Sequence, residues 1–430
     1  MSHGIRGGLL RRHRDFRLLW CGETAGKFGA SVTGVAMPLV GVSTLHASTF
    51  EIGLLSAAAW APWLIIGLPV GAWVDRLRRR PVMLASCAIS LVLFAGVPVA
   101  AWSGWLSIGL LLSVALLTGT AAVFFQTAYS AYLPSILEPD DQPEGNAKLH
   151  GSASAAQIAG LGSGGLIAQL AGAVNGMFVN AATFLVSLLC LAGIRHREPR
   201  ITRTGRPTSL VGEVREGLRL IAHDPWFRTF TLFGAASNLA LMGYQSIQVV
   251  FLVRSVGLTP GTVGLLVAAT SAGGVAGAFA ARRVAHRIGT ARATLLFQLG
   301  LPTLGLLIPL TVAGAGTLLF VTGGCSIVAG VVAGNTIKAS FQQRYCPPDL
   351  LGRLTASSAF LSYGTIPIGA LLGGVLATAL GLRTAMAVTT AGVPIAALIL
   401  LFSPIRRSRD LPMSRPAACQ RLSRKAAGPA

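Results

Sequence analysis

Charged side chains are scarce in this chain of 430 residues, and acidic ones are the scarcest of all. Asp and Glu number 14 against 35 Lys and Arg, and the four types together make up 11% of the sequence. A soluble domain carries about 25%. Hydrophobic residues make up 53%, and the mean hydropathy is +0.66. This balance excludes an ordinary soluble domain and indicates that lipid surrounds most of the chain.

The residue patterns that build metal centres and catalytic sites are also missing. The six cysteines include no C-x-x-C pair, and the seven histidines are scattered outside the centres of the apolar runs. Neither a disulfide framework nor a zinc site is therefore indicated. The sequence contains no H-E-x-x-H and no G-x-S-x-G, and no apolar run holds two acids. We expect no metal, no cofactor and no enzyme active site.

Long apolar runs, by contrast, recur along the whole chain. A helix needs about 20 apolar residues to cross the hydrocarbon core of a bilayer, which is about 30 Å thick. The runs predict an all-α polytopic membrane protein with twelve transmembrane helices, an even number that returns both termini to one side. The predicted spans are 18–41, 52–74, 82–102, 106–128, 152–172, 174–194, 229–252, 261–281, 293–313, 317–338, 357–380 and 384–403.

The basic residues alternate with these spans. Nearly all of the 35 Lys and Arg lie on the side that holds the N-terminus; Arg254 and Arg383 lie on the other side, and Lys27 lies within a span. A nucleic-acid-binding surface would gather its basic residues on one face, so the net charge of +21 does not indicate nucleic acid as a partner. By the positive-inside rule the basic side is cytoplasmic. We expect a multi-pass protein of the inner (plasma) membrane with both termini in the cytoplasm.

The longest hydrophilic interval between spans, residues 195–228, divides the chain into two sets of six spans. We expect a cytoplasmic N-terminal segment at 1–17, six-helix bundles at 18–194 and 229–403, and a basic cytoplasmic tail at 404–430. The second part of the linker predicts an amphipathic helix lying at the membrane surface. Its apolar face consists of Leu210, Val214, Leu218 and Ile221.

The two sets of spans repeat each other at a shift of about 208 to 211 residues, as duplicated halves of a transporter do. Such a repeat predicts two six-helix pseudo-repeats. Three segments correspond in the same order: 71–81 with 282–292, Asp141 with Asp349, and 160–165 with 369–374.

Two ionisable residues interrupt the first span. Glu23 and Lys27 are four residues apart and share one helix face with Ser31. A charge at the centre of a span costs about 2.5–3.5 kcal/mol on insertion scales, so it often marks function. Glu23 is a candidate proton carrier, although a neighbouring cation hinders its protonation. The alternative is an ion pair at spacing i,i+4 that only stabilises the helix.

A candidate substrate cavity combines polar and aromatic side chains from the first, second and seventh spans. Such a cavity between the halves would be mostly apolar and weakly polar. The alternative is that the amides bond neighbouring helices and the tryptophans pack. The candidates are Ser31, Trp60, Trp63, Asn238, Met242, Gln245 and Gln248, of which the last four share one helix face.

The charged stretch "GAWVDRLRRRP" between the second and third spans resembles a signature of the major facilitator superfamily, Gly-x-x-x-Asp-Arg-x-Gly-x-Arg-Arg. Arg78 stands where the pattern has glycine. The resemblance, which covers residues 16–403, implies a cytoplasmic gate in which the acid accepts hydrogen bonds from a helix N-terminus or pairs with an arginine. The alternative is charge that only orients the chain. The matching residues are Gly71, Asp75, Arg76, Arg79 and Arg80.

The run "GLGSGG" is similar to the Gly-Pro-x-x-Gly-Gly motif on helix 5 of proton-driven antiporters, with Leu161 in place of proline. The resemblance implies a conformational hinge, and small residues also let helices approach closely. The run spells G-x-G-x-x-G as well, but no strand precedes it, so a dinucleotide site is excluded. The motif residues are Gly160, Gly162, Gly164 and Gly165.

Two further segments, "QRYCPPDLLGRLTA" and "VREGLRLIAHDPWFR", resemble the branch with macrolide and siderophore exporters. Together the resemblances imply a monomeric secondary transporter that exports a hydrophobic small molecule, such as an antibiotic, secondary metabolite or siderophore. Its partners would be the substrate, protons and the lipid bilayer, and its mechanism alternating access. An importer and a membrane scaffold that transports nothing remain as alternatives.

Overall fold

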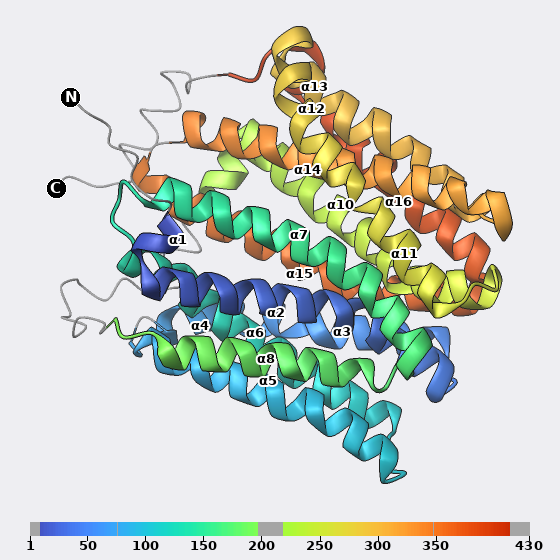
Figure 1. Cartoon of the computed structure of the whole chain (residues 1–430). Coiled ribbons are helices and arrows are strands. Elements are labelled where there is room, and N and C mark those ends of the chain that lie inside the picture. The colour runs from blue at the N-terminus through green and yellow to red at the C-terminus, as the bar shows by residue number, and fades with distance from the viewer. Residues whose placement is uncertain (1–8, 75, 197–217, 347, 413–430) are drawn as a thin grey trace. The chain divides into compact units, whose positions relative to one another are not determined.

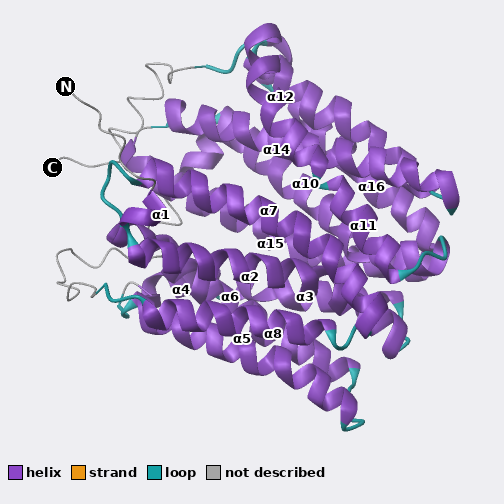
Figure 2. Ribbon diagram, in the orientation of Figure 1, coloured by secondary structure: helices purple, strands orange, loops and turns teal. Residues whose placement is uncertain are grey.

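The computed structural model describes residues 9–74, 76–196, 218–346 and 348–412, and helices are the regular elements throughout these ranges (Figures 1 and 2). This confirms the predicted all-α class. The α-helices are α1 (Leu9–Arg12), α2 (Arg14–Leu39), α3 (Thr49–Ile65), α4 (Gly67–Val74), α5 (Arg79–Trp102), α6 (Ile108–Ile136), α7 (Gln142–Ala171), α8 (Gly176–Gly193), α10 (Pro225–Val250), α11 (Pro260–Thr270), α12 (Ala272–Ile288), α13 (Thr290–Leu295), α14 (Thr317–Tyr345), α15 (Pro348–Leu380) and α16 (Leu382–Leu401).

Among the described residues, ten helical segments are long and apolar enough to cross a membrane. Two of the predicted spans fall outside this group. The span predicted at 52–74 is divided into α3 and α4. The break follows from Pro69, which lacks the N–H that would bond to the carbonyl of Ile65. The span predicted at 152–172 coincides with the C-terminal part of α7, a helix of 30 residues that is rich in glycine and serine and is not among the ten apolar segments.

The chain forms two compact units, here called the N-unit (1–206 with 246–269) and the C-unit (207–245 with 270–430). Helix α10 passes from one unit into the other. Residues 246–269 join the N-unit because α11 packs on α7 at a pair of glycines. A Cβ built on Gly165 would lie 2.6 Å from Gly264 Cα, so only the absence of side chains permits this approach.

Within the N-unit, α2 lies beside both α7 and α8 (Figure 1). Toward α8, the carbonyl of Gly22 accepts a hydrogen bond of 2.5 Å from Ser187 Oγ. Toward α7, Thr24 Oγ1 donates to Ser152 Oγ at 2.9 Å. Short polar side chains and glycines thus join the three helices. This is expected in a bilayer, where the hydrophobic effect does not drive helices together.

The C-unit has an aromatic core at the start of α10. Asp224 caps this helix, because its Oδ1 accepts hydrogen bonds from the backbone of Trp226 at 3.0 Å and of Phe227 at 3.2 Å. Tyr345 donates its hydroxyl to Asp224 Oδ2 at 3.2 Å. Ile221 is buried in the same core.

The predicted amphipathic linker helix is only partly within the described ranges. Residues 218–223 are helical, with Ile221 buried and Leu218 exposed. Leu210 and Val214 lie outside the described residues, so the helix at the membrane surface stays a prediction.

Among the close helix crossings, one in each unit lies at positions that the predicted repeat pairs, Gly160 and Gly369. In the N-unit, a Cβ on Gly160 of α7 would lie 2.5 Å from the carbonyl oxygen of Phe28 on α2. In the C-unit, a Cβ on Gly369 of α15 would clash with the carbonyl oxygen of Leu239 on α10. Both crossings therefore require glycine.

Candidate functional site

The stretch predicted as a cytoplasmic gate includes the end of α4, the loop that follows and the start of α5. Asp75, its acidic residue, lies outside the described residues. Gly71 is half-buried with no neighbour within 4 Å of a built Cβ, and Arg76 is exposed. The loop's gating role accordingly stays a prediction.

The last two arginines of this motif have defined partners inside the N-unit. Arg79 Nη1 donates to the carbonyl of Ala131 in α6 at 3.0 Å. Arg80 donates to the carbonyls of Leu191 at 3.1 Å and Ala192 at 2.6 Å, at the end of α8. Cations favour the C-terminal ends of helices, where carbonyls lack helical partners. These arginines therefore fasten the start of α5 to the ends of two neighbouring helices.

The helix 5 motif lies in α7 and contacts two helices. Gly160 and Gly164 face α2: built Cβ atoms would lie 2.5 Å from Phe28 O and 3.0 Å from Val32 O, respectively. Gly162 and Gly165 face α11 instead. The motif thus permits close packing on two sides of one helix, which is compatible with both the packing and the hinge interpretation.

Glu23 and Lys27 form the ion pair that their spacing allows. Glu23 Oε1 lies 3.3 Å from Lys27 Nζ, and the side chains are 9% and 44% exposed, respectively. The Glu23 carboxylate is near enough to Cys87 of α5 and Tyr129 of α6 to interact with both electrostatically. The acid therefore faces the interior of the N-unit, while its lysine partner is more accessible. Ser31 donates its hydroxyl to the Lys27 carbonyl at 2.8 Å.

The two tryptophans of the predicted substrate cavity are neighbours on α3. Their ring centroids are 6.5 Å apart, and both Trp60 and Trp63 are half-buried. Trp63 packs against the buried cluster of the N-unit.

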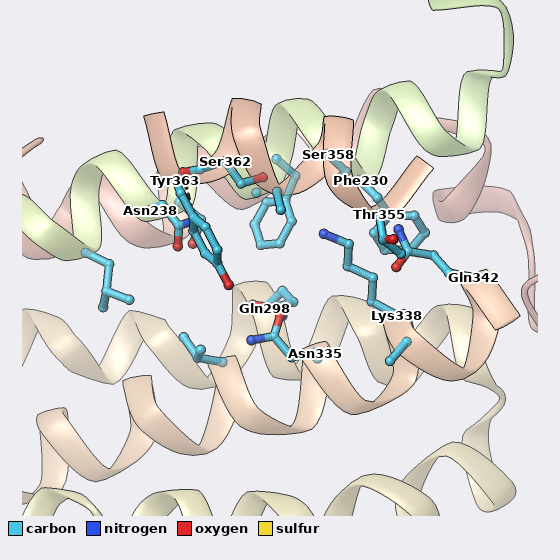
Figure 3. Close-up of a pocket in the computed structure, with 18 residues that line it drawn as sticks. Phe230, Asn238, Gln298, Asn335, Lys338, Gln342, Thr355, Ser358, Ser362 and Tyr363 are labelled. Carbon is cyan, nitrogen blue, oxygen red and sulfur yellow. Dashed lines mark hydrogen bonds between the residues drawn. The ribbon is translucent and has the colours of Figure 1, made fainter. Parts of the chain in front are cut away.

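A cavity of about 300 Å³ lies within the C-unit, between α10, α14, α15 and the π-helical turn Leu296–Gly300 (Figure 3). Of the predicted cavity residues, Asn238 lines it, and its Nδ2 donates to the Ser362 carbonyl at 3.0 Å. Met242, Gln245 and Gln248 lie farther along α10 and do not line it.

Lys338 is the charged residue of this cavity, and the sequence did not predict it there. Because it ends the apolar run 317–338, it was counted with the cytoplasmic charges. In the structure α14 continues to Tyr345, so Lys338 lies about two turns inside the helix. Figure 3 shows its amine reaching into the cavity from α14. The available signal was an ionisable residue bordering an apolar run.

In the described residues, no group of three or more His, Cys, Asp or Glu could hold a metal ion.

Comparison with known proteins identifies the family. A sequence model described as Major Facilitator Superfamily matches residues 19–363. The chain belongs to this superfamily. It is therefore a multi-pass membrane transporter and not an enzyme. The resemblance found in the sequence is confirmed.

Named relatives extend over nearly the whole chain. The multidrug efflux pump Tap of Mycolicibacterium fortuitum is 28% identical over 426 residues, which cover 96% of this chain and 99% of Tap. The enterobactin exporter EntS of Salmonella choleraesuis is 24% identical over 412 residues, covering 94% and 96%. Among solved structures, a bacterial homologue of the iron transporter ferroportin in its inward-facing state aligns with a TM-score of 0.72 at 14% identity, covering 92% and 99%. The nucleoside transporter NupG aligns with a TM-score of 0.66 at 11% identity, covering 92% and 99%. These structures share the fold.

Proposed function

We propose that this protein is a plasma-membrane antiporter that exports hydrophobic small molecules from the cytoplasm in exchange for protons, by alternating access. The observation that carries the proposal is the match with Tap, which spans almost all of both chains and whose name describes a multidrug efflux pump. EntS, an exporter by name, supports the same direction of transport.

The architecture proposed for this activity has twelve spans in two six-helix repeats. The α3–α4 pair and α7 would add two spans to the ten apolar ones. Helix α7 can be less apolar because its glycine faces pack on α2 and α11 instead of lipid. The glycine crossings at Gly160 and Gly369 support duplication, and so do α6 and α14, which are both 29 residues long. The excess of Lys and Arg on one side supports cytoplasmic termini.

Glu23 is the proposed proton carrier. Its carboxylate is 9% exposed and faces the interior of the N-unit, and its Oε1 lies 3.3 Å from Lys27 Nζ. Protonation of Glu23 would leave Lys27 without its counter-ion, so the pair has to separate or be rehydrated during the cycle. Proton binding would thereby be coupled to a rearrangement of α2.

The remaining proposed roles follow the sequence motifs. The gate residues Gly71, Asp75, Arg76, Arg79 and Arg80 would hold the cytoplasmic side closed in one state, and the α7 glycines would let its helix contacts change. A pocket with aromatic walls and few polar groups tolerates related ligands. Residues proposed to contact the substrate are Ser31, Trp60, Trp63, Asn238, Met242, Gln245 and Gln248.

Drug accumulation in whole cells tests the proposal. Cells that express the protein and cells with an empty vector would be loaded with a panel of hydrophobic antibiotics, with and without an uncoupler. Proton-driven export predicts lower accumulation in expressing cells, rising to the control level when the gradient collapses. Accumulation above the control that falls on uncoupling would show import and refute the proposed direction.

A further inference from the structure

The C-unit cavity contains a cation, Lys338, for which the described residues supply no partner. Of the described residues that line the cavity, Lys338 is the one that carries a charge. Among the described residues, no carboxylate lies within 4.0 Å of its amine, and the amine makes no hydrogen bond. An ammonium group that is partly removed from water and unpaired is unfavourable, so it favours binding of an anion.

A buried hydroxyl borders the same space. Ser362 is 7% exposed, and its Oγ has no hydrogen-bond partner among the described residues. A Cβ built on Gly234 would lie 3.1 Å from Ser362 Oγ and 3.6 Å from Lys338 Nζ. The two groups therefore meet beside Gly234, where the lack of a side chain leaves room for a ligand atom.

Side-chain amides add further donors. The side chain of Gln298 packs against Gly334 of α14, where a built Cβ would clash with the Gln298 amide. In the described part of the chain, the side chains of Gln298, Asn335 and Gln342 make no hydrogen bond. The cavity wall thus offers an ammonium, a hydroxyl and three amides, and its described residues include no Asp or Glu. This set of donors is matched by a ligand that supplies acceptors and negative charge.

The size and the apolar walls specify the ligand further. A cavity of about 300 Å³ is at the lower limit for small-molecule sites, so it admits a small acid or the acidic end of a larger molecule. Phe230, Phe233 and Leu241 line it along α10 and offer contact to an apolar body. We propose that this cavity binds the carboxylate of an amphiphilic organic acid, with Lys338 as its counter-ion. The cargo would then include organic monoanions, an extension that rests on the proposed export.

Binding of a carboxylate and its neutral amide tests the site. Full-length protein in phosphatidylcholine nanodiscs would be dialysed to equilibrium against 1-naphthoate or 1-naphthamide, which differ in charge but little in shape. We expect naphthoate to bind about tenfold tighter. Lys338→Gln should abolish that preference, and Lys338→Arg should keep most of it. Arg344→Gln, on the exposed end of the same helix, is the matched control and should bind as the wild type does.

Several outcomes would overturn the proposal. Equal binding of the two probes by the wild type would do so, as would an undiminished preference in Lys338→Gln. Displacement of naphthoate by phosphatidylglycerol, dependent on Lys338, would assign the site to a lipid headgroup instead. If Lys338→Gln is not monodisperse, Ser362→Ala replaces it and should weaken naphthoate binding several-fold while sparing naphthamide. Because dialysis needs no gradient, failed binding refutes the anion site alone, whereas absent export of neutral antibiotics refutes the proposed function alone.

Discussion

Replacing Gly160 with alanine is expected to destabilise the protein by forcing α7 away from α2. A Cβ at this position would lie 2.5 Å from Phe28 O and 2.7 Å from Ser31 Cβ. Favourable contacts between carbon atoms are about 3.5–4.0 Å long, so the helices must separate by roughly 1 Å. The opposing atoms belong to the backbone or are the first atom of a side chain. A change of rotamer therefore cannot relieve the clash.

The expected loss of stability follows from comparison with Gly162, two residues along the same motif. There a Cβ would meet only Ala268 Cβ, at 3.5 Å, which is an ordinary contact. Alanine stabilises a helix interior by about 0.8–1.0 kcal/mol relative to glycine, and both variants gain this stabilisation. Overpacking a tight contact costs about 1–3 kcal/mol, and only Gly160→Ala incurs it. We expect the free energies of unfolding of the two variants to differ by that cost.

Apparent melting temperatures of the two variants provide the assay. Both would be purified in one detergent and heated at one rate, because membrane proteins often unfold irreversibly. For domains of 150–250 residues, 1 kcal/mol corresponds to about 2–4 °C. Gly160→Ala should therefore melt several degrees below Gly162→Ala. Equal melting temperatures would refute the tight crossing of α2 and α7.

Two further substitutions separate the roles of charged residues. Arg80→Gln removes hydrogen bonds to the carbonyls of Leu191 and Ala192, so it should lower the free energy of unfolding by about 1 kcal/mol. Arg78 is exposed, so the control Arg78→Gln should change that free energy little. Equal losses in the two variants would contradict a stabilising role for the α8 contacts. Glu23→Gln should abolish substrate-induced proton release, measured with a pH dye on purified protein, and should spare substrate binding. Glu51→Gln is its control, in a capping box at the start of α3. Proton release that survives in Glu23→Gln would place the carrier elsewhere.

The helical class could be predicted from composition because lipid imposes one requirement on every span. A segment of about 20 residues must be apolar and must satisfy its own backbone hydrogen bonds. The requirement weakens where a helix contacts protein instead of lipid. Helix α7 shows this, since its glycines at 160 and 164 face α2 and its hydropathy falls below that of the ten apolar segments. The division of α3 from α4 depended on Pro69, a local effect within an apolar run.

The candidate site was less accessible to sequence reasoning. Glu23 was recognised because a charge within an apolar run is conspicuous, and its ion pair with Lys27 follows from helical spacing. Lys338 lies at the end of such a run, where a cytoplasmic loop was equally consistent with the sequence. Gln298 reaches the cavity from a π-helical turn, and its position opposite Gly334 arises from tertiary packing. Neither residue's surroundings are encoded in a local pattern.

The two units place different charges at positions that the predicted repeat pairs, which gives a last prediction. Shifts of about 211 and 209 residues pair Glu23 with Gly234 and Tyr129 with Lys338. Glu23 interacts with Tyr129 in the N-unit, and a Cβ on Gly234 would lie 3.6 Å from Lys338 Nζ in the C-unit. In its described residues, the C-unit therefore has the cation but no acid beside it. Gly234→Asp should supply that acid and pair with Lys338.

An internal partner for Lys338 should exclude an external one. Gly234→Asp is expected to lose about tenfold or more in affinity for 1-naphthoate in equilibrium dialysis, because its carboxylate neutralises the ammonium and repels the ligand. Gly234→Asn has nearly the same shape without the charge, so it measures the effect of crowding beside Ser362 alone. If the two variants bind naphthoate equally, crowding accounts for any loss, and Lys338 does not act as the counter-ion of a bound carboxylate.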